Sequence, residues 1–291
     1  MTNKCLTLAL HGGAGAMPDR PYDAEMALLR QLAEQGRDRL VSGAAAMDVV
    51  VEMVAALEAC GLFVAGRGAS ANAAGRFELD ACLMDGLSRR AGAVAALEGF
   101  KSPIRAARAV METTPHVMLV ADGAAELAGG AGLEEIGDPA AWFTPVRRRA
   151  APSPDGLSHG TVGCVVRDGE GRLAAGTSTG GVFGKRLGRV GDAPIPGSGT
   201  WADETVAVSC TGLGEYFMRT ATASQVAFRM RFGGEALAAA ADAALAEVKA
   251  LGGDGGLIAV NAAGEIVTPY NSKGMSRAVL RGDGVIEVGV F

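Results

Sequence analysis

The sequence predicts an α+β fold of layered sheets with helices outside them. In the second half of the chain, strand patterns cluster at both ends, with helical patterns between them. The first half begins with a strand, continues with helices and returns to strands. This order differs from the regular strand–helix alternation of a parallel α/β sheet. With 291 residues, 49% of them hydrophobic, the chain can bury a substantial core in one or two domains.

Hydrophobic spacing supports each element of the N-terminal half. Leu6, Leu8 and Leu10 alternate along one face of a strand, which ends at the glycine-rich His11–Gly15. Apolar residues at helical spacing follow, with Ser42 as the expected N-cap of the second helix. The expected elements are a strand at Lys4–Leu10, helices at Ala24–Val41 and Ala44–Cys60, a small-residue loop at Leu62–Arg76, strands at Phe77–Met84 and Ala91–Ala96, a helix that opens at Ser102-Pro103, a strand at His116–Ala121 and a helix at Asp122–Leu127.

Strands also dominate the C-terminal half. A β-branched, alternating run starts at Thr161 and forms a hairpin around Asp168–Gly171. A long Gly- and Pro-rich loop is expected at Val182–Asp203. The expected elements are strands at Thr161–Arg167, Leu173–Ser178 and Val206–Cys210, helices at Leu213–Phe232 and Glu235–Leu251, and strands at Leu257–Val260, Glu265–Thr268, Arg277–Leu280 and Val285–Val290.

The junction between the halves is the most informative stretch of the sequence. Residues 137–160 contain four prolines and three consecutive arginines, which indicates a linker of a length seldom tolerated inside a compact domain without a purpose. The linker stops at Gly160, and a strand begins at Thr161. Cutting the bond between them would give Thr161 a free α-amine, and that pairing activates a weak hydroxyl nucleophile. We therefore hypothesise a self-cleaving N-terminal threonine hydrolase.

Three further segments carry groups suited to amide hydrolysis. Residues 177–181 end a strand antiparallel to the one starting at Thr161, so a hydroxyl there can face that threonine. Arg189 and Asp192 form a cation–anion pair in a glycine-flexed loop, as the carboxylate and ammonium of an amino acid require. Residues 209–215 join a strand to a helix, where backbone N–H groups can stabilise an oxyanion. Each segment alone is also typical of a structural role, but their joint occurrence after the linker favours catalysis.

Composition narrows the partners of the protein. The net charge of −5 argues against a nucleic-acid surface, and the basic run at Arg147–Arg149 is expected to be solvated linker. No stretch is long and apolar enough to span a membrane, and the apolar run in Met1–Leu10 is too short for a signal peptide. Five irregularly spaced cysteines give no disulfide framework. We expect a cytoplasmic protein that acts on a small molecule.

A series of ordered motifs runs through almost the whole chain. They are His11–Gly15, Leu79–Gly86, His159–Gly163, Thr177–Gly181, Gly188–Asp192, Cys210–Glu215 and Gly252–Ala259. In this order they resemble the plant-type L-asparaginase/isoaspartyl peptidase family of N-terminal nucleophile hydrolases. The resemblance implies a four-layer αββα sandwich and autoproteolysis of a single domain into an α chain (1–160) and a β chain (161–291). It also implies a homodimer of αβ pairs.

The resemblance further implies a role for each matching residue. Thr161 is the nucleophile, and the Thr179 hydroxyl orients it. Arg189 binds the substrate α-carboxylate and Asp192 its α-ammonium, with Gly214 near the substrate amine. Thr211 and Gly212 form the oxyanion hole and also contact the substrate. The bond implied to be cut joins Gly160 to Thr161.

One loop both matches the family and departs from it. The resemblance implies that no cofactor is required, and that the backbone of this loop can hold a structural sodium ion. The residues concerned are Leu62, Phe63, Gly66 and Gly68. The family usually has Asn-Ala-Gly where this chain has Val64-Ala65-Gly66, and that Asn helps to polarise the oxyanion region. Because valine cannot hydrogen-bond, we expect an altered efficiency or substrate preference.

The implied activity is release of aspartate from L-asparagine, from β-aspartyl peptides or from both. An alternative within the same mechanism is a glycosylasparaginase-like hydrolase, although the sequence lacks the secretory signal and cysteine framework expected for it. A different alternative is an uncleaved, inactive homologue that only binds amino acids.

Overall fold

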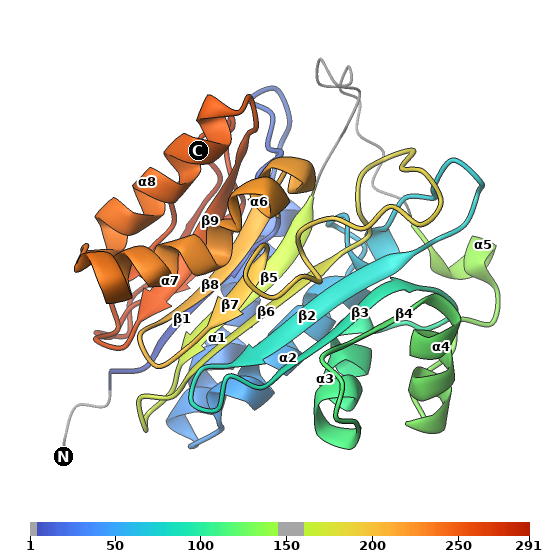
Figure 1. Cartoon of the computed structure of the whole chain (residues 1–291), viewed down its shortest axis with the longest axis horizontal. Coiled ribbons are helices and arrows are strands. Elements are labelled where there is room, and N and C mark those ends of the chain that lie inside the picture. Colours follow the sequence, from blue (N-terminus) through green and yellow to red (C-terminus); the bar gives the residue numbers. More distant parts are fainter. Residues whose placement is uncertain (1–4, 145–159) are drawn as a thin grey trace.

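The computed structural model describes residues 5–144 and 160–291, whose strands form two sheets (Figure 1). The larger sheet has the order β12-β11-β1-β5-β6-β2-β3-β4, and the smaller has the order β10-β9-β8-β7. The larger sheet consists of β1 (Thr7–His11), β2 (Leu79–Asp85), β3 (Ala91–Leu97), β4 (Met118–Val120), β5 (Thr161–Arg167), β6 (Leu173–Thr179), β11 (Arg277–Leu280) and β12 (Ile286–Gly289). The smaller consists of β7 (Thr200–Ala202), β8 (Val206–Gly212), β9 (Gly255–Asn261) and β10 (Ile266–Val267).

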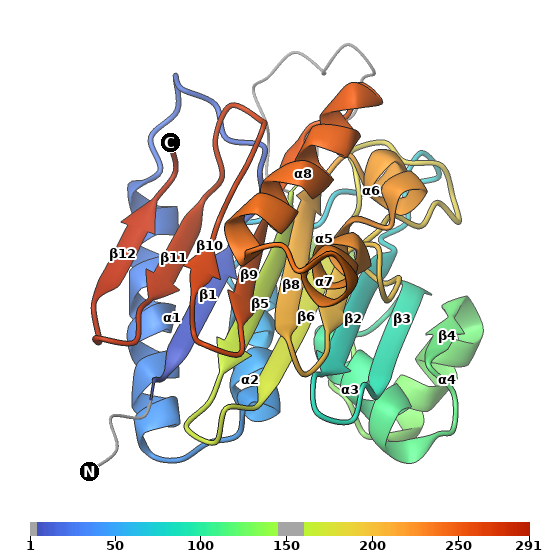
Figure 2. The same cartoon turned by 60° about the vertical axis from the view of Figure 1, so that its left-hand side comes forward.

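Helices flank these sheets. Figure 2 shows α8 and α7 in front of the smaller sheet, and α1, α2 and α3 behind the larger one. The helices are α1 (Asp23–Val41), α2 (Ala46–Ala59), α3 (Pro103–Thr113), α4 (Ala121–Gly130), α5 (Pro139–Trp142), α6 (Gly214–Thr220), α7 (Thr222–Gly233) and α8 (Leu237–Ala250), with a short 3₁₀ turn at Gly66–Gly68. This mixture of sheets and helices confirms the predicted α+β class.

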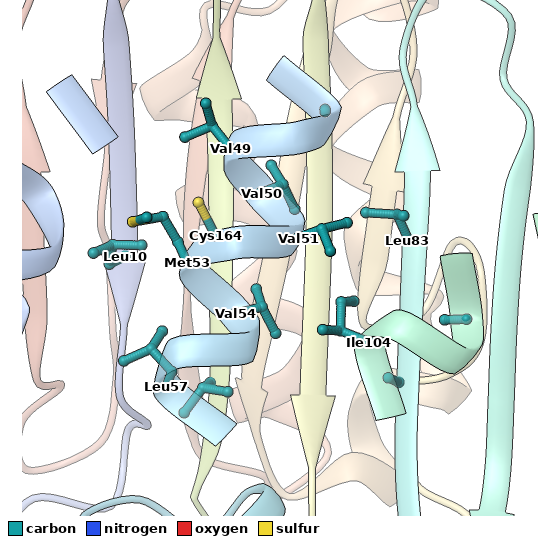
Figure 3. Packing of buried hydrophobic residues seen from close by; sticks show 14 of the residues in the cluster. Leu10, Val49, Val50, Val51, Met53, Val54, Leu57, Leu83, Ile104 and Cys164 are labelled. Carbon is teal, nitrogen blue, oxygen red and sulfur yellow. The ribbon is translucent and has the colours of Figure 1, made fainter. Parts of the chain in front are cut away.

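Buried apolar side chains join the elements in three large clusters. One lies between α1, α2, α3 and the larger sheet, and Figure 3 shows α2 over this sheet near Cys164 and Leu83. A second cluster joins the two sheets, because Val165 of β5 and Ile258 of β9 both belong to it. The third joins the smaller sheet to α6, α7 and α8. Since side chains alternate along a strand, Cys164 faces the helices while Val165 faces the other sheet.

Strand β5 lies in the middle of the larger sheet. It pairs antiparallel with β1 on one side, with Gly163 opposite His11, and with β6 on the other, with Thr161 opposite Thr179. On its far side β6 pairs with β2, which places Asp80 opposite Thr179. The strands that precede and follow Gly160 are therefore interleaved within a single sheet.

Most predicted elements are confirmed, with small shifts at their ends. The prediction of Ser42 as the N-cap of α2 is wrong, because α2 begins after Ala45 and the Ser42 hydroxyl donates to the Arg39 carbonyl at the end of α1. The single helix predicted at Leu213–Phe232 is also wrong. It is broken into α6 and α7 at Ala221, whose left-handed φ of 47° interrupts the helix.

Three short elements lie where the sequence predicts loop, and one of them is the 3₁₀ turn at Gly66–Gly68. Strand β7 falls inside the loop predicted at Val182–Asp203 and is held by pairing with β8. Helix α5 falls inside the predicted linker, where the Asp138 carboxylate accepts a hydrogen bond from the Ala140 N–H at 2.9 Å. The remainder of that linker, residues 145–159, lies outside the described residues, as does Lys4. Within residues 5–144 and 160–291, no helix combines the length and apolarity needed to cross a membrane.

Candidate active site

Two threonine hydroxyls meet where β5 begins and β6 ends. The Thr161 hydroxyl donates to Thr179 Oγ1 at 3.2 Å, and the Thr179 hydroxyl lies 3.4 Å from the Gly160 carbonyl oxygen, to which it can donate. Thr179 Oγ1 also accepts the Gly181 N–H at 3.0 Å. Both threonines are buried. The structure thus brings together the predicted nucleophile, its predicted orienting residue and the bond predicted to be cut.

The glycine-rich loop after β1 packs against that bond. A Cβ atom on Gly13 would lie 3.0 Å from Gly160 Cα and 3.2 Å from the Thr161 nitrogen, and its φ of +105° favours glycine. The next residue, Ala14, donates its N–H to Thr211 Oγ1 at 3.3 Å. Through this loop, Thr211 at the end of β8 is connected to the junction of Gly160 and Thr161.

The residues predicted to bind the amino-acid part of a substrate lie together. A Cβ atom on Gly214, the first residue of α6, would lie 2.7 Å from Asp192 Oδ1 and 3.1 Å from Arg189 Nη2. The absence of a side chain at Gly214 therefore leaves room beside both charged groups. Gly212 is also closely packed, because a Cβ there would overlap the Asp254 carbonyl.

Arg189 has a partner that the sequence did not predict. Its Nε and Nη2 atoms each donate to the Glu215 carboxylate at 2.9 Å, so Glu215 takes one edge of the guanidinium. A guanidinium has five N–H donors, and a second carboxylate can use its Nη1–Nη2 edge. The ion pair lowers the pKa of Glu215 against the opposing effect of burial.

The carboxyl group of Asp192 is buried. Burial raises its pKa to about 7, although the nearby Arg189 guanidinium works in the opposite direction. Its Oδ2 atom is buried and has no hydrogen-bond partner among the described residues. A buried acceptor without a partner costs free energy, and a substrate ammonium group would supply the missing donors.

A buried ionic cluster lies beneath the loop that carries Arg189 and Asp192. The Lys185 ammonium donates to the Glu78 carbonyl at 2.9 Å and lies 4.0 Å from Asp80 Oδ2. The Glu78 carboxylate accepts the Gly188 N–H at 2.8 Å and the Asn72 amide at 2.7 Å. These contacts tie the loop to β2, a role that the sequence analysis missed.

Val64 contributes to the site through its backbone. Its carbonyl accepts the Gly180 N–H at 2.8 Å, which holds the residue that follows Thr179. Together with Gly12 and Gly13 it also lines a small cavity of about 20 Å³. The position at which the family usually has Asn is therefore close to the predicted cleavage bond.

The predicted sodium loop presents backbone oxygens. A Cβ on Gly68 would overlap the Phe63 carbonyl oxygen, and a Cβ on Gly66 would overlap that of Glu58. Gly66 has a φ of +50°. Carbonyl oxygens are ligands that suit a hard cation. The Phe63 carbonyl accepts the Ala65 N–H at 2.8 Å and the Gly66 carbonyl accepts the Ala69 N–H at 3.1 Å, so the sodium role of this loop stays a prediction. The Leu62 N–H donates to Cys60 Sγ at 3.3 Å.

His11 is a further buried group at the site that the sequence analysis noted only as part of a motif. Its Nδ1 lies 3.0 Å from the Thr161 carbonyl oxygen and its Nε2 lies 2.9 Å from Ser209 Oγ. Burial lowers the pKa of His11 to about 3, against the raising effect of the Thr161 carbonyl. The imidazole is therefore neutral at physiological pH.

Known proteins are similar to this chain along nearly its whole length. A protein-family model described as Asparaginase matches residues 4–151 and 142–290. The isoaspartyl peptidase of Salmonella typhimurium is 44% identical, over 93% of this chain and 94% of that protein. The isoaspartyl peptidase of Escherichia coli is 42% identical, over 93% and 91%. The plant-type L-asparaginase of Pyrobaculum calidifontis is 40% identical, over 93% and 95%.

Proposed function

Because this chain belongs to the asparaginase family, we propose that it is a hydrolase that releases aspartate from L-asparagine and from β-aspartyl peptides. The names of its relatives support both substrates. The observation that carries the proposal is the hydroxyl pair of Thr161 and Thr179 at the start of β5. Arg189 and Asp192, which lie together beside Gly214, supply the charges that an amino acid requires.

The first stage is self-cleavage. Thr161 Oγ attacks the Gly160 carbonyl carbon, the Gly160–Thr161 amide bond breaks, and the hydroxyl proton ends on the Thr161 nitrogen. Water then hydrolyses the ester, which leaves a Gly160 carboxylate and a free Thr161. The Thr179 hydroxyl can hydrogen-bond the Gly160 oxygen as charge develops there. The products are an α chain (1–160) and a β chain (161–291).

The second stage is turnover. The Thr161 amine, with a reference pKa of about 7.7–8.0, takes the proton of its own hydroxyl as Oγ attacks the substrate side-chain carbonyl. The same proton goes to the leaving ammonia or peptide amine as the amide bond breaks. Water then hydrolyses the ester on Thr161 and releases aspartate. Thr211 and Gly212 face the oxyanion. The hydrogen bond from the Ala14 N–H of the glycine-rich loop to Thr211 Oγ1, at the end of β8, supports this assignment.

The charged residues hold the rest of the substrate. Arg189 binds the α-carboxylate through the guanidinium edge that Glu215 leaves available. Asp192 accepts the α-ammonium, with Gly214 leaving room beside it. The buried Asp192 Oδ2, which has no hydrogen-bond partner within residues 5–144 and 160–291, supports this role.

Further properties of the family are part of the same proposal. The clusters between helices, sheets and helices support a four-layer αββα sandwich. The backbone carbonyls of Leu62, Phe63, Gly66 and Gly68 would hold a structural sodium ion, and the ion would stiffen the loop that contains Val64. The active form is a homodimer of αβ pairs. Five free cysteines support a reduced, cytoplasmic location.

Intact-mass measurement tests the proposal directly. The wild-type protein should give two chains, one that ends at Gly160 and one that begins at Thr161. The Thr161→Ala variant should stay uncut and inactive. Turnover of asparagine, a β-aspartyl dipeptide and glycosylated asparagine then separates the proposed activity from a glycosylasparaginase. A single uncut chain with full activity would overturn the mechanism. An uncut wild-type chain that binds aspartate without turnover would instead identify an inactive homologue.

A further inference from the structure

Polar side chains form a continuous row behind the predicted nucleophile. His11 of β1, Gly163 of β5 and Thr177 of β6 are register neighbours across the larger sheet. In the smaller sheet, Ser209 of β8 is paired with Thr200 of β7. His11, Thr177, Ser209 and Thr200 are all fully buried. The row therefore crosses the interface between the two sheets without exposure at the surface.

Short hydrogen bonds connect the members of this row. Thr200 Oγ1 donates to Thr177 Oγ1 at 2.6 Å, and Thr177 Oγ1 lies 2.7 Å from Ser209 Oγ. Ser209 Oγ lies 2.9 Å from His11 Nε2. His11 Nδ1 lies 3.0 Å from the Thr161 carbonyl oxygen. The alternative acceptors are farther away, since Thr177 Oγ1 is 3.2 Å from the Gly199 carbonyl and Thr200 Oγ1 is 3.0 Å from that of Ala193.

The chemistry of the last acceptor fixes the direction of every bond. A carbonyl oxygen can only accept, so the hydrogen of the neutral His11 imidazole is on Nδ1. Nε2 must then accept, which makes Ser209 a donor to it. The Ser209 oxygen accepts from Thr177, and Thr177 accepts from Thr200. All donors thus point from Thr200 toward Thr161, an arrangement in which successive bonds strengthen one another.

Gly163 provides the space that this row needs. A Cβ atom at this position would overlap both Ser209 Oγ and His11 Nε2. Gly163 lies two residues after Thr161, so both point to the same face of β5. At Gly163 this face lies against the His11 imidazole. A residue with any side chain at 163 would separate His11 from Ser209.

We propose that His11 is a positioning residue, which holds the main-chain carbonyl of Thr161 at the end of a one-way hydrogen-bond chain through Ser209, Thr177 and Thr200. This inference rests on the proposed role of Thr161. After cleavage Thr161 is a chain terminus, and termini are mobile unless they are tied down. A fixed carbonyl sets the rotation of the Thr161 main chain and so the direction of its amine and hydroxyl. Misplacement of reacting atoms by about 1 Å costs on the order of 100-fold in rate.

The first test is spectroscopic and does not depend on activity. The full-length protein, labelled with ¹⁵N in its histidine rings, reports which ring nitrogen carries hydrogen. The proposal requires His11 to be protonated on Nδ1 and unprotonated on Nε2 across pH 5–9, a range chosen to include the ordinary histidine pKa of about 6.5. His11→Asn identifies its signals. A hydrogen on Nε2, or a mixture of tautomers, would overturn the chain.

The second test compares two variants of His11, each of which keeps only one of its two hydrogen bonds, with two further variants. The amide of Asn at position 11 reaches the place of Nδ1, so His11→Asn can still donate to the Thr161 carbonyl. The amide of Gln reaches the place of Nε2, so His11→Gln keeps only the side toward Ser209. Ser209→Ala keeps the imidazole and its bond to Thr161. His116→Asn, at an exposed position outside the site, is the control.

The measured quantity is kcat per cleaved chain, with a β-aspartyl dipeptide as substrate. Its expected order among the variants follows from these contacts. His116→Asn equals wild type, Ser209→Ala and His11→Asn fall below it, and His11→Gln falls on the order of tenfold further, with KM unchanged. The rate of self-cleavage should follow the same order, which also covers a variant that cleaves too slowly for turnover. Equal losses in His11→Asn and His11→Gln would overturn the proposal. A wild-type protein without turnover would refute the proposed function but leave the ring-nitrogen result standing.

Discussion

The Lys185 ammonium and the Asp80 carboxylate lie 4.0 Å apart, and both side chains are fully buried. Asp80 sits opposite Thr179 in the sheet, and Lys185 belongs to the loop that leads to Arg189. Burial raises the pKa of Asp80, while Lys185 opposes that shift. The pair therefore joins the nucleophile side of the site to its substrate-binding side, at the cost of two desolvated charges.

Removal of one member of this pair should destabilise the protein strongly. We expect Lys185→Met to lose about 3–5 kcal/mol of unfolding free energy, because it leaves Asp80 buried without its cation. The double variant Lys185→Met/Asp80→Asn should recover part of the loss. Urea unfolding measures both. Arg281→Met, which breaks an exposed pair with Glu287, should change stability by about 0–1 kcal/mol; an equal loss there would show that burial is not the cause.

The Thr179 hydroxyl should matter for both stages of the reaction. Thr179→Val removes the acceptor of the Thr161 and Gly181 hydrogen bonds, and the donor toward Gly160. We expect self-cleavage and kcat each to fall on the order of 10²–10³-fold, as for loss of one oxyanion donor. Thr179→Ser keeps the hydroxyl and should stay near wild type. Intact mass over time and steady-state kinetics measure the two effects. Similar losses in both variants would contradict a role for the hydroxyl.

Asp192 should make substrate binding depend on pH. With its pKa raised to about 7 by burial, the carboxyl is protonated below pH 7 and lacks the charge that attracts an ammonium group. We expect the affinity for aspartate to rise between pH 5.5 and 8 and then to level off, as calorimetry can measure. Asp192→Asn should bind weakly at every pH. A pH-independent affinity in the wild type would contradict the proposed contact.

The same shift predicts the opposite trend for stability. The unfolded chain releases the Asp192 proton near pH 3.9, whereas the folded chain holds it up to about pH 7. Between these values the folded state binds more protons, so this group lowers stability as pH rises. Asp192→Asn should therefore gain stability relative to wild type as pH rises from about 4 to 7. Unfolding midpoints at both pH values provide the comparison.

Introducing at position 64 the amide that the family resemblance implies should raise amide hydrolysis. Val64→Asn places a donor beside Gly12 and Gly13, in a cavity of about 20 Å³. We expect a higher kcat for asparagine, together with a stability loss of about 1–3 kcal/mol if the amide finds no partner in the free enzyme. Val64→Leu controls for volume. An unchanged kcat in Val64→Asn would contradict a role for the side chain at position 64 in amide hydrolysis.

Local patterns predicted the strands well, and also that a hydroxyl at the end of the second strand faces Thr161. Thr161 and Thr179 lie in adjacent antiparallel strands whose hairpin is visible in the sequence, so their contact follows from register. The left-handed conformation of Ala221 was not predictable, because alanine favours helix. Strand β7 has three residues, too few for a pattern, and depends on β8 for its hydrogen bonds.

The ionic and hydrogen-bond partners at the site were beyond local patterns. Glu78 and Lys185 are separated by 107 positions, and His11 and Ser209 by 198. Such contacts exist only once the sheets are assembled. The sequence identifies Arg189 as a cation that can bind a carboxylate. Its ion pair with Glu215 is seen only in the folded chain.

The interleaved strands of the larger sheet have a consequence for how the protein can be remade. If the bond before Thr161 is cut, β5 and β6 of one polypeptide lie between β1 and β2 of the other. Neither can leave without breaking the ladders that β5 forms with β1 and β6 with β2. Renaturation of the cut protein then becomes a second-order reaction of two polypeptides, whereas Thr161→Ala refolds in a first-order one. The mature form would persist through its slow unfolding, as a kinetically stable product of an intact precursor.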